Sequence, residues 1–478
     1  MKCHLRTCIG LPIALRLALA TLAVSFLLVS TAPGQPAVAA PGDRVADRVL
    51  GQPDFTSNTP NNGGISASSL ASPSGVAVDG SRNLFVADRG NNRVLEYNTP
   101  LTTDTVADRV FGQAGSFTTN DCNKGGVISA SSICVPAQVA VDSSGNLFVA
   151  DELNNRVLEY DSPLTTDTVA DRVFGQAGSF TTNDCNKGGV ISASSLCHPW
   201  GVAVDGAGNL YVADQGNSRV LEYDTPLTTN TVADRVFGQA GNFTTGDCNK
   251  GGVISASTLC GVGWVAVDDA NNLYVSDRGN ARVLEYDTPL TTNTVADRVF
   301  GQPDFTSHTC NNGGVSASTL CVPGGLAVDN AGNLYAPDAY TGGFNNRVLE
   351  YDTPLTTDTV ADRVFGQPDF SSNTCNNGGL SASSLCDPAA AAVDAARNVY
   401  VADQSNARLL EYDASVAPPV GGIAQLPDVA GTSVDEAGVP ADGSGWSAGG
   451  YAALAGGLAV VAAAIAVGGW YARRRWLR

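Results

Sequence analysis

The octapeptide VADRVFGQ recurs along this chain at an almost constant spacing. Its arginine stands, 61 to 65 residues apart, at Arg48 (within VADRVLGQ), Arg109, Arg172, Arg235, Arg298 and Arg363. A second landmark, the tripeptide AVD, follows each copy once and ends at Asp79, Asp142, Asp205, Asp268, Asp329 and Asp394. A period this long and this regular indicates a repeat protein of six equivalent units.

Each unit is predicted to form four short antiparallel strands. In the first full unit these are residues 75–79, 83–88, 93–97 and 107–113, in which apolar residues alternate with polar ones. Alternation with a period of two is typical of strands, and the connections GSR, RGNN and TPLTTDTV are rich in turn-forming residues. Four antiparallel strands per unit describe one blade of a β-propeller.

The two ends of the repeat region are complementary. The region begins with a lone fourth strand, residues 46–52, and the sixth unit stops after its third strand, residues 408–412. If the first strand pairs with the last unit, every blade has four strands and none is left with an unpaired inner edge. We therefore predict an all-β fold over residues 43–413, a six-bladed propeller of four-stranded antiparallel blades closed by the N-terminal strand. An open solenoid is the alternative, but it does not require complementary ends.

The units resemble NHL repeats over the whole of residues 43–413. The family pattern of a Pro-Gly start, an AVD strand, a YVAD strand, N-x-R-V and a closing F-G is matched by SPSGVAVDGSRNLFVADRGNNRV in unit one and HPWGVAVDGAGNLYVADQGNSRV in unit three. Units four, five and six depart from it at GVGWVAVD, APD and DPAAAAVD. The resemblance implies a propeller fold and leaves open which ligand, if any, the propeller binds.

Both ends of the chain carry predicted targeting segments. Residues 1–40 have a basic start, an apolar run and a small-residue finish, which is typical of a secretory signal peptide, with an uncleaved anchor as the alternative. Residues 448–472 are apolar and uncharged and precede the basic tail 473–478, so they predict one transmembrane helix with its C-terminus in the cytoplasm. Residues 414–447, rich in Pro, Gly, Ala and Ser, are predicted to form a flexible stalk. The expected location is the cell membrane, with the propeller outside the cell.

Ten of the twelve cysteines form five pairs inside the predicted propeller. The pairs are Cys122/Cys134, Cys185/Cys197, Cys248/Cys260, Cys310/Cys321 and Cys375/Cys386. Each pair brackets the connection between one blade's fourth strand and the next blade's first, and in the N-terminal copy Pro60 and Ala71 replace both members together. Joint loss is expected of a bonded pair, so we predict five disulfides, each contributing on the order of 3 kcal/mol. Zinc binding is the alternative, but close CxxC spacings are absent.

The loops that carry these cysteines are expected on the same face as the loops between strands two and three, and the PLTTDT connections on the opposite face. An Asp–Arg pair such as Asp88 and Arg93 recurs in every unit, which favours a structural ion pair over a ligand-binding role. Positions that differ between units are better candidates for a binding site. The predicted ligand-binding residues are Trp200, Trp264, Tyr340, Phe344 and His198. Aromatic side chains beside polar ones suit a sugar ring or an extended peptide, with a plug of the central channel as the alternative.

The sequence offers few candidate catalytic residues. Six of the eight glutamates repeat at the VLEY position, and the chain has three histidines, so we predict no catalytic residues and no metal site. Calcium at the TTNDCNKGG loops, which offer Asp121 and Asn123, is the one cofactor alternative, with turn formation as the default.

The net charge limits the classes of partner that the protein is expected to bind. All 46 acidic residues lie between the two end segments with 20 of the 27 basic ones, which gives that part a net charge of −26 and argues against nucleic acid as a partner. We expect a cell-surface binding or scaffold module that recognises a protein, peptide or glycan through the disulfide-loop face. The alternative is an extracytoplasmic metal-dependent hydrolase or lyase, whose six-bladed architecture is similar.

Overall fold

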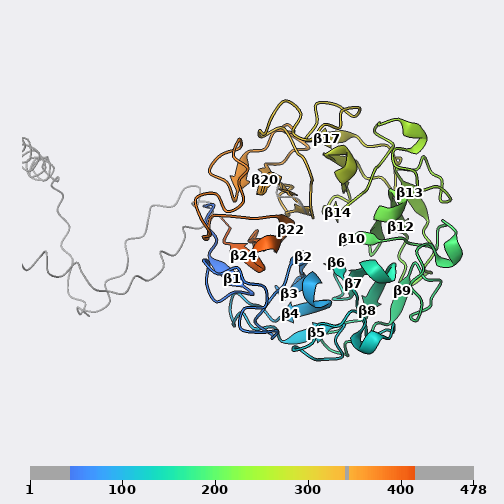
Figure 1. The fold of residues 1–478 in the computed structure, drawn as a ribbon. Coiled ribbons are helices and arrows are strands. Elements are labelled where there is room, and N and C mark those ends of the chain that lie inside the picture. Colours follow the sequence, from blue (N-terminus) through green and yellow to red (C-terminus); the bar gives the residue numbers. More distant parts are fainter. Residues whose placement is uncertain (1–42, 340–343, 415–478) are drawn as a thin grey trace, which may run out of the picture. The chain divides into compact units, whose positions relative to one another are not determined.

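Six four-stranded antiparallel sheets form a closed ring (Figure 1). The computed structural model describes residues 43–339 and 344–414. From the centre outwards, the blades are β2–β5, β6–β9, β10–β13, β14–β17, β18–β21 and β22-β23-β24-β1, here called blades one to six. The predicted all-β, six-bladed propeller is confirmed.

The strands take four positions in each blade. The innermost are β2 (Pro73–Val78), β6 (Pro136–Val141), β10 (Pro199–Val204), β14 (Val265–Val267), β18 (Ala327–Val328) and β22 (Pro388–Val393). The second are β3 (Leu84–Asp88), β7 (Leu147–Asp151), β11 (Leu210–Asp214), β15 (Leu273–Asp277), β19 (Leu334–Asp338) and β23 (Val399–Asp403). The third are β4 (Arg93–Tyr97), β8 (Arg156–Tyr160), β12 (Arg219–Tyr223), β16 (Arg282–Tyr286), β20 (Arg347–Tyr351) and β24 (Arg408–Tyr412). The outermost are β1 (Arg48–Leu50), β5 (Arg109–Phe111), β9 (Arg172–Phe174), β13 (Arg235–Phe237), β17 (Arg298–Phe300) and β21 (Arg363–Phe365).

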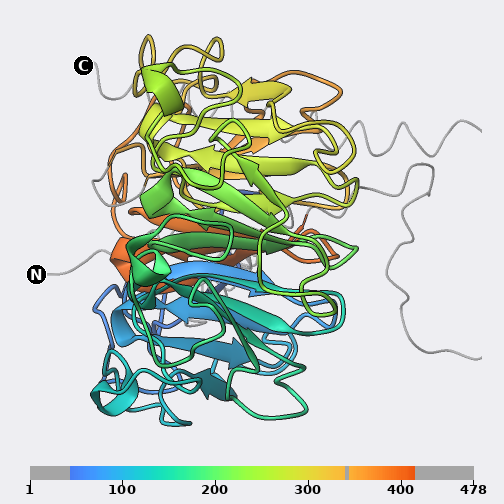
Figure 2. The same cartoon turned by 90° about the vertical axis from the view of Figure 1, so that its right-hand side faces the viewer.

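Short 3-10 helices join some of these strands, and from the side they gather on one face of the ring (Figure 2). Between second and third strands lie η1 (Arg89–Asn91), η3 (Glu152–Asn154), η5 (Gln215–Asn217), η7 (Arg278–Asn280) and η8 (Gln404–Asn406). In the connections between blades lie η2 (Lys124–Gly126), η4 (Lys187–Gly189) and η6 (Lys250–Gly252).

The outer strands are three residues long, shorter than the seven residues 107–113 that the sequence pattern suggests. In blade one the chain leaves the sheet at Gly112, whose φ of 87° favours glycine. A Cβ there would lie 2.7 Å from the side chain of Ile133, so the turn also requires a residue without a side chain.

The N-terminal strand closes the ring as predicted. β1 pairs antiparallel with β24, so that Arg48 faces Glu411 and Leu50 faces Leu409. The amide of Asp47 extends this ladder by donating to the carbonyl of Glu411 at 2.8 Å. Blade six is therefore built from both ends of the repeat region.

A repeated aromatic contact fills the space between neighbouring blades. Phe111 of β5 meets Tyr160 of β8 edge to face, with ring centroids 5.2 Å apart, and four further junctions repeat the pair at 5.1–5.3 Å. At the sixth, Leu50 takes the place of the phenylalanine and shares a buried cluster with Tyr97. Apolar burial between blades thus contributes to the stability of the ring.

The predicted signal peptide, the transmembrane helix with its cytoplasmic tail, and all of the predicted stalk beyond Ala414 lie outside the described residues. None of the helices within residues 43–339 and 344–414 combines the length and apolar character that a membrane span requires.

Candidate functional site

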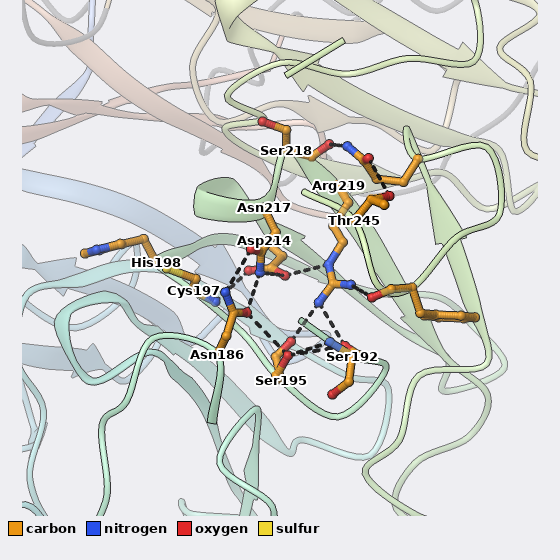
Figure 3. A network of polar contacts seen from close by, with 12 residues as sticks. Asn186, Ser192, Ser195, Cys197, His198, Asp214, Asn217, Ser218, Arg219 and Thr245 are labelled. Atoms are coloured by element: carbon orange, nitrogen blue, oxygen red, sulfur yellow. Dashed lines mark hydrogen bonds and ion pairs between the residues drawn. The ribbon is translucent and has the colours of Figure 1, made fainter. Parts of the chain in front are cut away.

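A buried ion pair in each blade holds two kinds of loop together on one face. In blade three, Arg219 donates from Nε to Oδ2 of Asp214 at 2.7 Å, and both side chains are fully buried (Figure 3). The other oxygen of Asp214 accepts the amide of Cys197 at 2.7 Å, while Arg219 also donates to the carbonyls of Ser192 and Ser195. The equivalent of Asp88 and Arg93 is therefore a structural pair in every blade, as the sequence favours.

The five predicted disulfides are confirmed. They join Cys122 to Cys134, Cys185 to Cys197, Cys248 to Cys260, Cys310 to Cys321 and Cys375 to Cys386, with Cα atoms 4.1–4.5 Å apart. Next to the first of them, Asn123 exchanges amide hydrogen bonds with Asn154 of η3 at 2.7 and 3.0 Å. The connection between blades is thus fixed to the loop between strands two and three, and both loops lie on the same face.

Asn123 is also relevant to the alternative that these loops bind calcium. Asn123 adopts a left-handed conformation, with φ of 52°, and its side-chain oxygen also accepts from Ser132. Within the described residues, no three His, Cys, Asp or Glu side chains lie close enough together to hold a metal ion. Calcium at these loops stays an alternative to the prediction of no cofactor.

Trp264 fills the centre of the ring. Its side chain is 0% exposed and packs against Trp200, Ala389 and Val322. The matching positions in the other blades are small or polar, and a Cβ on Gly201 would lie 2.6 Å from the Trp264 Cα atom. Contrary to the sequence-based expectation, this indole presents no surface on which a ligand could stack, because the inner strands close around it.

The inner strands of blades five and six even pair with each other. Gly325 donates its amide to the carbonyl of Ala389 and accepts from the amide of Ala391, both at 2.8 Å, which makes a parallel bridge between these neighbouring blades. Trp264 and this bridge bring the inner segments of blades three to six into contact.

Trp200 lies one residue nearer the loop face than Trp264 and is partly exposed. The two rings are 5.4 Å apart, and the guanidinium of Arg278 lies 5.0 Å from the Trp200 ring centroid. A cation–π contact of this kind uses one face of the indole within the protein itself.

Two positions on the loop face change their side chain from blade to blade, and we call them together the rim. One directly follows the second strand and holds Arg89, Glu152, Gln215, Arg278, Ala339 and Gln404. The other precedes the innermost strand and holds Ser72, Val135, His198, Gly261, Val322 and Asp387. Cationic, anionic, carboxamide and apolar side chains alternate at these two positions, whereas the buried Asp–Arg pair beside them is the same in every blade.

A chain of polar contacts crosses three blades of the rim. Arg89 of η1 forms an ion pair with Glu152 of η3, whose side chain is 8% exposed. The other carboxylate oxygen of Glu152 lies 3.9 Å from Nδ1 of His198, which is 42% exposed. This arrangement fixes the orientation of Arg89 and presents the imidazole to solvent.

Beside it the rim is hollowed into a pocket of about 460 Å³ between blades six, one and two. Its walls carry hydroxyl, carboxamide, guanidinium and carboxylate groups, from Ser72, Arg89, Asn92, Asp387, Gln404 and Ser405. Ser405 donates to Asp387 at 2.9 Å, which holds that carboxylate in the wall. We call this hollow the rim pocket.

The aromatic candidates are only partly brought together. Trp200 and Trp264 are in contact and His198 belongs to the rim, but Phe344, 44% exposed, lies in the blade-five insertion, and Tyr340 falls outside the described residues. Arg89, Glu152, Asp387 and Gln404 of the rim are not among the residues predicted from the sequence. Their signal was available, because these positions also differ between repeats.

The fold defines a class, the six-bladed β-propellers. The NHL repeat family model matches residues 70–97 and 196–223, which are parts of blades one and three, so NHL repeats are present in these two blades. Among curated proteins, it is similar to Protein SUPPRESSOR OF QUENCHING 1, chloroplastic, from Arabidopsis thaliana, with 27% identity over 284 residues. That match covers 58% of this chain and 24% of the plant protein, so the chain spans about a quarter of its relative.

Solved structures show low similarity. A protein of unknown function from Bacteroides thetaiotaomicron is 14% identical, with a TM-score of 0.45, over 76% of this chain and 74% of the other. Virginiamycin B lyase from Staphylococcus aureus is 11% identical, with a TM-score of 0.37, over 72% and 85%. A streptogramin B lyase is 12% identical, with a TM-score of 0.38, over 75% and 95%.

Proposed function

We propose that this protein is a binding module that recognises a protein, peptide or glycan through the disulfide-loop face, and that the rim pocket is its site. The observation that carries the proposal is the variation of side chains at the rim. Side chains change in chemical class from blade to blade at these two positions, while the buried groups that hold the loops are repeated. Loops on a rigid scaffold are where binding residues are commonly found.

The chemistry of the rim pocket favours a ligand rich in neutral hydrogen-bonding groups. Sugar hydroxyls and peptide groups both donate and accept, as do the Ser72, Asn92 and Gln404 side chains. The net charge of −26 between the end segments disfavours a polyanion, because like charges repel at long range. We assign no catalytic step to this face.

The test is binding of the full chain to a glycan array and a peptide array, beside two variants. Gln404→Ala truncates a wall of the rim pocket, and we expect roughly threefold to tenfold weaker binding, as for one lost hydrogen bond. The control, Arg82→Gln, lies on the opposite face, where the Arg82 side chain is 50% exposed. Equal binding by the parent and Gln404→Ala would exclude the rim pocket as the binding site. Weaker binding by Arg82→Gln would assign recognition to the opposite face.

We also propose that the propeller lies outside the cell and is tethered by one helix. The support is the sequence of residues 1–40 and 448–478, with five disulfides that suit an oxidising compartment. Protease added to intact cells should then remove the propeller from the surface, and its complete protection would contradict this location.

A further inference from the structure

Five of the six junctions between blades share a contact on the face opposite the rim. The connection between the third and outer strands carries the sequence PLTT, and we call it the PLTT loop. The outer-strand arginine of one blade donates to a main-chain carbonyl in the PLTT loop of the next blade. The contacts are Arg48 to Pro100 and Leu101 (3.2 Å each), Arg109 to Leu164 (3.1 Å), Arg172 to Leu227 (3.3 Å), Arg235 to Pro289 (3.4 Å) and Arg298 to Leu355 (3.3 Å). The leucine of each PLTT loop also packs on the core of its blade.

The sixth junction, between blades five and six, has no such loop. The third and outer strands of blade six come from opposite ends of the repeat region, so no PLTT loop joins them. Arg363 stands at the equivalent position and pairs through Nε with Glu350 at 3.3 Å. In the part of the chain that the structure describes, no main-chain carbonyl accepts from this guanidinium, and the Arg363 side chain is 38% exposed.

A pocket of about 410 Å³ opens at this junction, and we call it the seam pocket. Its apolar walls are Tyr335, Phe365, Val399 and Tyr412. The counterparts of these side chains one junction earlier are Tyr274, Phe300, Leu334 and Tyr351. Leu355 packs against the cluster that these counterparts form, and they are 0% exposed, whereas the walls of the seam pocket are 2–5% exposed. The surface that a leucine covers at one junction is therefore partly accessible at the next.

The polar groups of the seam pocket limit the ligand further. Its charged residues are Asp43, Glu350, Asp352, Asp413, Arg363 and Arg397. Carboxylates outnumber guanidinium groups, so an anionic ligand is disfavoured. The Glu350 carboxylate pairs with Arg363 and accepts from the Tyr335 hydroxyl at 3.2 Å. A neutral main-chain carbonyl beside an aliphatic side chain matches the remaining guanidinium donors and the apolar walls.

We propose that the seam pocket binds a leucine-containing peptide turn of a partner protein. The leucine side chain lies against the apolar walls, and its main-chain carbonyl accepts from the Arg363 guanidinium. Both contacts repeat those of Leu355, whose carbonyl accepts from Arg298 at 3.3 Å and whose side chain packs on the core of blade five. A second copy of the chain does not offer such a leucine, because its own PLTT leucines are packed within its ring.

The test is an NMR titration of the full chain with a peptide that has the sequence of residues 352–357, DTPLTT. One buried leucine and one hydrogen bond predict a dissociation constant on the order of 1 mM. The Leu355→Ala form of the peptide should bind at least about tenfold more weakly, because it loses most of the apolar area. A Leu355→Lys form tests whether the carboxylates of the pocket select a cation instead.

Two variants of the protein locate the binding site. Arg363→Gln should weaken binding of the DTPLTT peptide roughly threefold to tenfold, as for one lost hydrogen bond. Arg298→Gln is the matched control and should bind like the parent, because the Leu355 carbonyl already occupies that junction. Thermal melts show whether both variants keep the fold. If Arg363→Gln does not fold, slower amide exchange at β21 of the parent on peptide binding locates the site.

Three results would overturn the proposal. Equal binding of the DTPLTT and Leu355→Ala peptides would show that the leucine is not recognised, and tighter binding of the Leu355→Lys peptide would assign the pocket to a cationic ligand. No binding of any peptide at about 10 mM would show that the pocket takes no external peptide. Binding at the rim pocket is measured with other ligands, so either site can fail without the other.

Discussion

At the scale of single residues, the ring depends on polar groups that are buried and hydrogen-bonded to one another. The Asp214 carboxylate accepts from Arg219, Asn217 and the amide of Cys197, all at 2.7 Å. Three donors around one carboxylate match its charged form, and they offset the cost of burial. The repeat keeps this cluster because removing one member leaves the others unpaired.

Substitution Asp214→Asn should therefore be strongly destabilising. It leaves the buried Arg219 guanidinium without a counter-charge, which costs roughly 3–5 kcal/mol. Urea denaturation of the full chain measures the loss, with the exposed Asp224→Asn as the control, for which a change within about 0.5 kcal/mol is expected. A similar small effect for both variants would show that the cluster is not essential for stability.

A second residue-scale prediction concerns pH. Burial raises the pKa of the repeated VLEY glutamates from 4.5 to about 7 at Glu96, Glu159, Glu222 and Glu350, and to about 8 at Glu285 and Glu411. The folded state then holds protons that the unfolded chain releases above about pH 4.5, so stability falls as pH rises from there through 7 to 8. The melting temperature should be lower at pH 8.5 than at pH 5.5, and Glu96→Gln should reduce the difference. A melting temperature that rises over this range would contradict it.

At the scale of elements, the ring is closed by a strand of three residues, β1. Leu50 is fully buried in it and takes the place of the phenylalanine found in the other outer strands. The prediction from sequence succeeded here, because the complementary ends of the repeat region leave one strand missing and one strand spare. The length of the outer strands was not predictable, since it depends on where the chain turns at glycines such as Gly112 against a neighbouring side chain.

Leu50→Ala should weaken this closure by about 2–5 kcal/mol, as for other buried leucines. Chemical denaturation of the full chain gives the value, beside Val45→Ala, whose side chain is 37% exposed. Equal stability of the two variants would mean that β1 contributes little to closing the ring.

At the scale of the whole molecule, six similar blades carry two departures from symmetry. These are the rim on one face and, on the other, a pocket of about 410 Å³ between blades five and six. The positions that vary between repeats can be read from the sequence, but the contacts that these residues make cannot. The burial of Trp264 depends on how closely Gly201 and Gly325 let neighbouring inner strands approach, and that distance is a property of the closed ring. Likewise the ion pair between Arg89 and Glu152 joins residues one whole repeat apart.

The central claim is that the rim pocket is the site of recognition. The most direct test is the hydrogen-exchange footprint on the full chain of a glycan or peptide selected on the arrays. We predict protection in η1 and η8, which flank the rim pocket, with no change in the PLTT loops of the opposite face. Protection confined to the PLTT loops, or none in η1 and η8 at saturating ligand, would contradict the account.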